Sequence, residues 1–114
     1  MVANNKNYKL VIFGNGQIAE EAYNYFQNDS EYEVVGFVVD DKFIKKNKFM
    51  GKILVPISKL KSKFPSETHK IFVAIGYTDL NQLRYKKYVE LKKKGYRFAS
   101  YISSHASLIG KQKI

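Results

Sequence analysis

Apolar and polar residues follow each other in blocks that predict strands and helices in turn. The run Tyr8 to Phe13 is apolar, β-branched and aromatic, and it stops at glycine, which is typical of a buried strand. The run Glu33 to Asp40 is a second strand of the same kind. Between them, residues 17–27 predict one amphipathic helix, since their apolar side chains recur at helical spacing: Ile18, Ala19, Ala22, Tyr23 and Phe26. Residues 8–40 therefore predict a βαβ unit.

The middle of the chain, residues 42–64, has a less regular pattern. It predicts a short strand at Lys52 to Val55, a turn at Pro56, and a brief helix or turn that ends near Phe64. A further apolar strand follows from His69 to Gly76.

The last third predicts one long helix and one strand. Thr78 or Asp79 can cap the helix, and Gly95 closes it. The strand runs from Tyr96 to Ile102, and the apolar face of the helix comprises Leu80, Leu83, Tyr88 and Leu91. Strands that alternate with helices predict an α/β fold, Rossmann-like and doubly wound, with a mainly parallel sheet.

A glycine-rich turn follows the first strand. The segment from Gly14 to Ala19, with Asn15, Gly16 and Gln17 inside it, fits the pattern G-x-G-x-x-[GA] where a helix begins. Such a turn lets backbone N–H groups and the helix dipole approach a phosphate. The alternative is that both glycines serve only turn geometry and helix packing.

Acidic residues end the second strand. Asp40 and Asp41 lie where a dinucleotide fold places the acid that binds a ribose hydroxyl, although aspartates there can also simply form a turn. Because carboxyl ends of parallel strands form the ligand crevice, Gly14, Asp40 and Gly76 are expected along one edge. The chain is short for a complete dinucleotide fold with a substrate site, and His69 is read as an ordinary strand-edge histidine.

Composition limits the function classes. The 114 residues include no cysteine, which excludes disulfides and thiolate chemistry, and 45% apolar content suffices for one core. The net charge of +10 comes mostly from scattered lysines, with Arg84 and Arg97 the two arginines, so a solvated basic surface is favoured over nucleic-acid binding. No segment resembles a membrane span or signal peptide, and we expect a cytoplasmic protein without membrane insertion or a bound metal.

The tail carries apolar residues six positions apart, at Ile102, Leu108 and Ile114. This period is typical of hexapeptide β-helix repeats, although a plain final strand with a polar tail remains the alternative. We therefore expect a Rossmann-like domain at residues 1–102, and at residues 103–114 a junction and the start of a truncated left-handed β-helix.

Four segments in order, "IFGNGQIA", "FVVDD", "FVAIGYTDLNQLR" and "ISSHASLIG", resemble the N-terminal domain of hexapeptide-repeat sugar acyltransferases. That family includes sialic acid O-acetyltransferases and the acetyltransferase that makes UDP-N,N'-diacetylbacillosamine. The resemblance implies a domain that binds a nucleotide-activated sugar, followed by a β-helix that forms a trimer and binds acetyl-CoA. It implies bacterial surface-glycan synthesis, with N- or O-acetylation of a UDP- or dTDP-sugar.

Carried over by position, the resemblance implies that Gly14, Asn15 and Gly16 lie against the phosphates, with Gln17 beside them. Asp40 and Asp41 would approach the nucleoside, and Gly76, Tyr77 and Arg84 would line the same crevice. The family more usually has a Ser-Gly-His-like turn where this chain has Asn15-Gly16-Gln17, so the contact from that histidine is missing. Arg84 can alternatively pack its stem on the sheet.

The family's catalytic histidine belongs to the β-helix beyond residue 114, and His105 is not assigned that role. We expect this chain to bind without catalysing and to hold no cofactor of its own, as a monomer or weak dimer where the full-length protein is a homotrimer. The alternatives are a stand-alone NAD- or CoA-binding regulatory module and a basic interaction domain.

Overall fold

The computed structural model describes residues 8–74 and 81–99, without the side chains of residues 29 and 81–84. In this part of the chain, six strands form one sheet in the order β3-β4-β2-β1-β5-β6. Strand β3 is antiparallel to β4, and the other neighbouring pairs are parallel. The bounds are β1 Tyr8–Phe13, β2 Tyr32–Val39, β3 Lys48–Phe49, β4 Lys52–Pro56, β5 His69–Val73 and β6 Arg97–Phe98.

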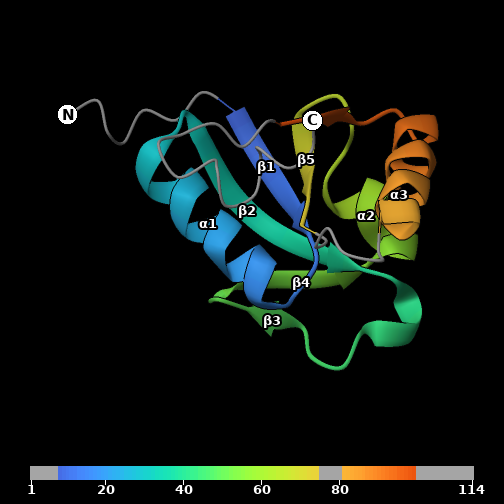
Figure 1. The fold of residues 1–114 in the computed structure, drawn as a ribbon, viewed down its shortest axis with the longest axis horizontal. Coiled ribbons are helices and arrows are strands. Elements are labelled where there is room, and N and C mark those ends of the chain that lie inside the picture. The colour runs from blue at the N-terminus through green and yellow to red at the C-terminus, as the bar shows by residue number, and fades with distance from the viewer. Residues whose placement is uncertain (1–7, 75–80, 100–114) are drawn as a thin grey trace.

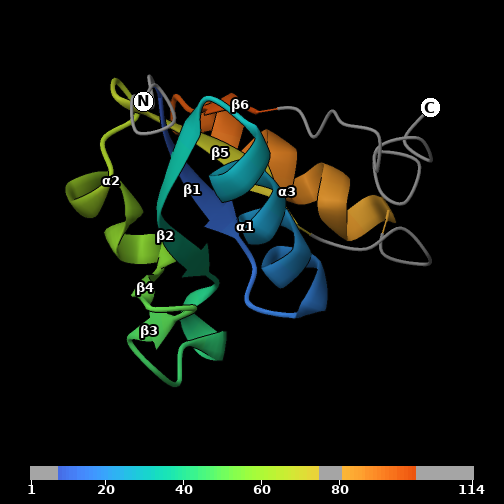
Figure 2. The ribbon, with the colours of Figure 1, turned by 90° about the vertical axis from the view of Figure 1, so that its left-hand side faces the viewer.

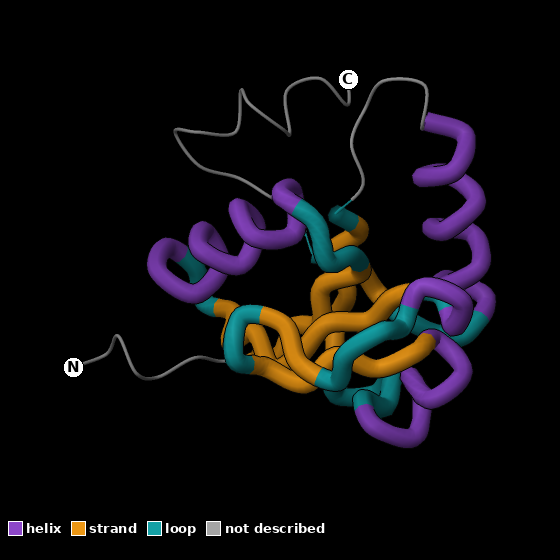
Figure 3. Tube along the Cα trace, turned by 90° about the horizontal axis from the view of Figure 1, so that it is seen from below, coloured by secondary structure: helices purple, strands orange, loops and turns teal. Residues whose placement is uncertain are grey.

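The helices cover both faces of this sheet. Helix α1 lies on one face, and α2 and α3 lie on the other (Figures 1 and 3). Figure 2 shows the sheet from its side, with β6 at one end and β3 at the other. The bounds are α1 Gln17–Asp29, α2 Leu60–Lys63 and α3 Asn81–Lys93, with short 3₁₀ turns η2 Asp41–Phe43 and η3 Ile57–Lys59. The predicted Rossmann-like, doubly wound α/β fold is confirmed, whereas the predicted β-helix start at residues 103–114 lies outside the described residues.

The central strand is buried on both faces, which explains its unbroken apolar run. Leu10 and Ile12 pack on the α1 side, in the same cluster as Phe26 of α1. Val11 and Phe13 pack on the other side, in the cluster of Leu91 of α3. Successive side chains of β1 therefore alternate between two cores, one on each face of the sheet.

Helix α3 ends as its sequence predicts. Gly95 has φ +99°, its N–H donates to the Lys92 carbonyl at 2.9 Å, and the Tyr96 N–H donates to the Leu91 carbonyl at 3.2 Å. These two bonds form a Schellman motif, which needs a left-handed residue at this position. The predicted caps at the other end, Thr78 and Asp79, lie outside the described residues.

The end of α1 and the middle segment differ most from the prediction. Helix α1 continues to Asp29 because the Ser30 hydroxyl donates to the Phe26 carbonyl at 2.6 Å and satisfies a terminal backbone group. A β3–β4 hairpin interrupts the irregular middle segment, with Met50 at φ 55° and Gly51 at φ 78° in its turn. Two consecutive positive φ angles are typical of a type I′ turn, which methionine seldom enters, so the sequence signal was weak.

Candidate functional site

The turn between β1 and α1 requires glycine at its first position. Gly14 has φ +129°, and an added Cβ would lie 3.0 Å from the Ala74 carbonyl oxygen. The Gly14 N–H donates to the Val38 carbonyl at 2.8 Å, and the Ala74 N–H donates to the Phe13 carbonyl at 2.9 Å. Three strand ends are thus joined around Gly14, where the crevice of a doubly wound sheet lies.

Gly16 has a different environment. It is the N-cap of α1 with φ −108°, and an added Cβ would meet nothing within 4 Å. The fold itself therefore does not require glycine here. The missing side chain leaves open space in front of the helix start, beside the exposed side chains of Asn15 and Gln17.

The start of α1 is suited to an anion. Among the described residues, no side chain caps this end, and the N–H groups of the first turn have no partner within the helix. The helix dipole adds partial positive charge at the same place. Gln17 makes one long contact, from Nε2 to Glu21 Oε2 at 3.4 Å, and remains at the surface. This turn can receive a phosphate on its backbone.

Asp40 lies at the carboxyl end of β2, on the α3 side of the sheet. Its Oδ1 accepts a hydrogen bond from Lys87 Nζ at 2.6 Å, and 29% of its side chain is exposed. The Lys87 ion pair leaves Oδ2 as a further acceptor of this carboxylate.

Asp41 has another partner. Its Oδ1 accepts a hydrogen bond from the Ser58 N–H at 3.0 Å, which ties the β2 end to η3. The hydrogen bonds from Ser58 lower the pKa of the Asp41 carboxyl, and this side chain is exposed. Asp41 therefore has a structural role, because its carboxylate connects the end of β2 to η3.

Lys87 is a site residue that sequence reasoning missed. It is 6% exposed, and its Nζ also lies 2.9 Å from Glu90 Oε1 and 4.9 Å from the centre of the Phe13 ring. Burial alone would lower the pKa of Lys87, but the hydrogen bonds and charges of Asp40 and Glu90 outweigh it and raise the pKa. Lys87 lies four residues before buried Leu91, on the same face of the helix, and this spacing was the available signal. A lysine among many exposed lysines nevertheless gives little reason to expect burial.

For three of the predicted site residues, the structure describes no side-chain contacts. Gly76 and Tyr77 lie outside the described residues, and for Arg84 the structure describes only the backbone, within α3. The structure brings Gly14, Asn15, Gly16, Gln17, Asp40 and Asp41 to the carboxyl edge of the sheet.

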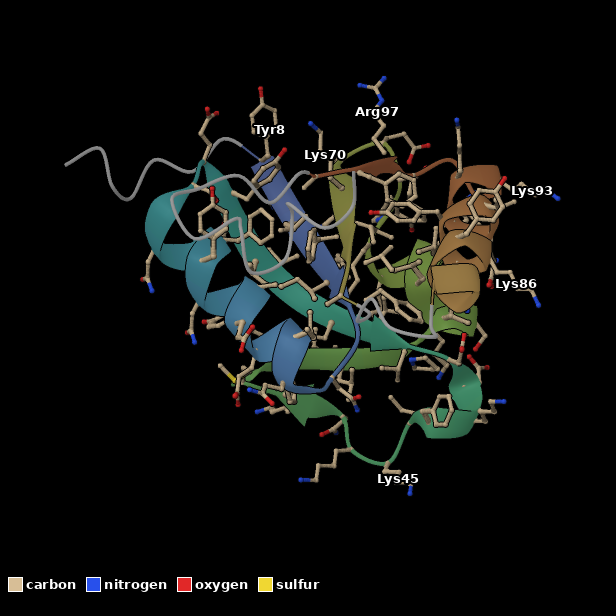
Figure 4. All side chains as sticks on the ribbon, in the orientation of Figure 1. Tyr8, Lys45, Lys70, Lys86, Lys93 and Arg97 are labelled. Carbon is tan, nitrogen blue, oxygen red and sulfur yellow. The ribbon has the colours of Figure 1, made fainter. Side chains whose placement is uncertain are left out.

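A cavity lies at the opposite edge, where the parallel strands begin. This cavity of about 390 Å³ is lined by residues that include Tyr8, His69, Lys70 and Arg97, and Figure 4 shows Tyr8, Lys70 and Arg97 along that edge. His69 Nδ1 lies 2.8 Å from Thr68 Oγ1 and 3.1 Å from the Pro65 carbonyl oxygen, and burial lowers the pKa of its ring. His69 is thus far from the glycine turn.

Among the lysines labelled in Figure 4, Lys45 points outward from the segment before β3, and Lys86 and Lys93 point outward from α3. Across the described residues, no three His, Asp or Glu side chains gather in a way that could hold a metal ion. In the same part of the chain, every helix is too short or too polar to cross a membrane.

Solved structures share the fold at low sequence identity. The acetyltransferase domain of PglB from Neisseria gonorrhoeae FA1090 has a TM-score of 0.66 and 18% identity over 86% of this chain. UDP-D-quinovosamine 4-dehydrogenase from Vibrio fischeri has a TM-score of 0.67 and 18% identity, over 92% of this chain and 86% of its own. The chain spans 45% of the Neisseria structure.

A search of curated protein sequences returned no match. The family model described as the PglD N-terminal domain matches residues 9–91, which include the glycine turn, both aspartates and most of α3. That match covers well over half of the 114 residues. The chain therefore belongs to the PglD N-terminal domain family.

Proposed function

We propose that this domain binds a nucleotide-activated sugar as the substrate-binding part of a bacterial sugar acetyltransferase. The observation that carries the proposal is the pair of glycines at the crevice: Gly14 is required by the fold, whereas Gly16 leaves open space at an uncapped helix start. Membership of the PglD N-terminal domain family and the fold shared with an acetyltransferase domain support this reading.

In this proposal, the backbone from Gly14 to Gln17 binds the diphosphate, with Asn15 and Gly16 closest to it. Asp40 faces the nucleoside, because Asp41 is already bonded to Ser58. Gly76, Tyr77 and Arg84 complete the crevice.

The reaction proposed for the whole enzyme is direct acyl transfer from acetyl-CoA in surface-glycan synthesis. An amine or hydroxyl of the sugar attacks the thioester carbonyl, a base takes its proton, and the carbon–sulfur bond breaks to release the CoA thiol. We assign the base and the acetyl-CoA site to a trimeric β-helix outside this sequence. The residues of this domain bind and position the acceptor, which lowers the entropic part of the barrier.

Calorimetric titration with UDP- and dTDP-amino sugars, NAD and CoA tests the proposal. The sugar nucleotides are expected to bind, and Gly16→Val is expected to abolish binding because its side chain fills the space in front of α1. Arg97→Ala is the matched control: it removes a positive charge at the opposite edge and is expected to leave binding unchanged. Binding of NAD or CoA alone, or equal losses in both variants, would contradict the proposal.

A further inference from the structure

Lys87 is the one buried charged residue among the described side chains, with 6% of its surface exposed, and it lies beside the proposed nucleotide crevice. Its Nζ is held from two sides, by Asp40 Oδ1 at 2.6 Å and by Glu90 Oε1 at 2.9 Å. The ammonium also lies over the Phe13 ring, at 4.9 Å from the ring centre. Phe13 and Asp40 stand at or just after the ends of β1 and β2, so this cluster forms part of the carboxyl edge.

Stability is a poor explanation for a lysine at this position. Removing an ammonium from water costs free energy, and ion pairs with carboxylates that stay 29% and 42% exposed return little of it. Position 87 shares the α3 side of the sheet with Leu91, in contact with Phe13. A methionine there could pack on the same ring without the cost of desolvation.

What the ion pair does fix is the orientation of Asp40. The Asp40 carbonyl accepts the Phe43 N–H at 2.9 Å, which holds the backbone, and Lys87 holds Oδ1. Within the described residues, Oδ2 has no hydrogen-bond donor in reach, and 29% of this side chain is exposed. Lys87 therefore fixes the position of Oδ1, and Oδ2 remains available as an acceptor at the carboxyl edge of the sheet.

We propose that Lys87 is a positioning residue that holds Asp40 so that Oδ2 accepts a hydrogen bond from the nucleoside part of the ligand. This inference rests on the proposed function. An ionised carboxylate accepts hydrogen bonds and donates none, so it selects an N–H or O–H group and repels phosphate. In a uridine nucleotide the candidates are the ribose hydroxyls and the imide N–H of the base.

The test compares binding of UDP, 2′-deoxy-UDP, 3′-deoxy-UDP and N3-methyl-UDP by calorimetry. The full chain is expected to prefer UDP over the analogue that lacks the donor by about tenfold or more, since a site built to hydrogen-bond a ligand O–H or N–H leaves its own acceptor unpaired when that group is absent. Lys87→Met is expected to weaken UDP binding by about tenfold and to remove this preference. Lys86→Met, which removes the neighbouring exposed lysine, is expected to keep both affinity and preference.

Asp40→Asn keeps an acceptor for Lys87 but replaces the second oxygen by an amide donor, so it is expected to lose the preference even if the Lys87 variant unfolds. The inference would be overturned if Asp40→Asn, or a folded Lys87→Met, preferred UDP as strongly as the unaltered chain does. That result would leave the proposed function intact. If the unaltered chain binds UDP without preferring it over any of the three analogues, the inference is likewise refuted. If it binds none of UDP, the UDP-sugars and the dTDP-sugars, the proposed function fails, and the role of Lys87 fails with it.

Discussion

The two glycines of the β1–α1 turn should respond very differently to the same substitution. Gly14→Ala places a side chain at φ +129°, a backbone conformation that costs an L residue about 1–3 kcal/mol. The new Cβ would also lie 3.0 Å from the Ala74 carbonyl oxygen. Ala74 is 8% exposed and its N–H donates to the Phe13 carbonyl, so a shift of this residue away from Gly14 would disturb the β1–β5 pairing.

The expected total for Gly14→Ala is a loss of about 2–4 kcal/mol in the free energy of unfolding, once the tight contact is added. Gly16→Ala meets no atom within 4 Å and has φ −108°. It should lose only about 0.5–1 kcal/mol, because alanine is a poorer N-cap than glycine. The difference of about 2 kcal/mol corresponds to roughly 8 °C in melting temperature for a domain of this size.

Urea unfolding followed by circular dichroism measures both values under the same conditions. The unaltered chain is the reference, and similar slopes with denaturant would show that the unfolded states are comparable. Equal losses for the two variants, or a Gly14→Ala variant as stable as the unaltered chain, would refute the assignment of Gly14 to the fold and Gly16 to the ligand.

Two further stability predictions concern the sheet and its α3 side. Gly36→Ala should cost about 1–3 kcal/mol in urea unfolding, since its Cβ would lie 2.5 Å from Cζ of buried Phe64; no loss would mean that this ring moves freely. Tyr96→Phe should cost about 1–3 kcal/mol at neutral pH because the Phe64 carbonyl loses its hydroxyl donor. Burial raises the pKa of Tyr96 from 10.0 to about 12, so the folded state retains a proton that the unfolded state releases. Stability should therefore fall between pH 10 and 12 more steeply in the unaltered chain than in Tyr96→Phe, and parallel curves would contradict this.

The fold was largely predictable because local patterns and tertiary packing agree. The strand at Tyr8–Phe13 is apolar throughout since both of its faces are covered, and Gly95 ends α3 since the Schellman motif needs its positive φ. The β3–β4 hairpin was not predictable in the same way. Its turn places Met50 at φ 55°, a conformation that its side chain does not favour.

The candidate site was predictable in position but not in its contacts. The pattern around Gly14 and Gly16 indicated the turn, but only coordinates show that one glycine is needed by the fold and the other is not. The pairing of Asp40 with Lys87 joins residues 47 positions apart, and no local pattern reports such a contact. Lysine is also the residue type least expected in a core, so its burial depends on partners that the linear sequence does not reveal.

The central claim is that a nucleotide-activated sugar binds at the carboxyl edge of the sheet. The most direct test is a titration of the isotopically labelled chain with UDP-N-acetylglucosamine, followed by amide NMR. The account predicts that the largest shifts fall on Gly14 to Ile18 and on Asp40. Shifts concentrated at the opposite edge would contradict this account and place the ligand in the cavity lined by Tyr8, His69, Lys70 and Arg97.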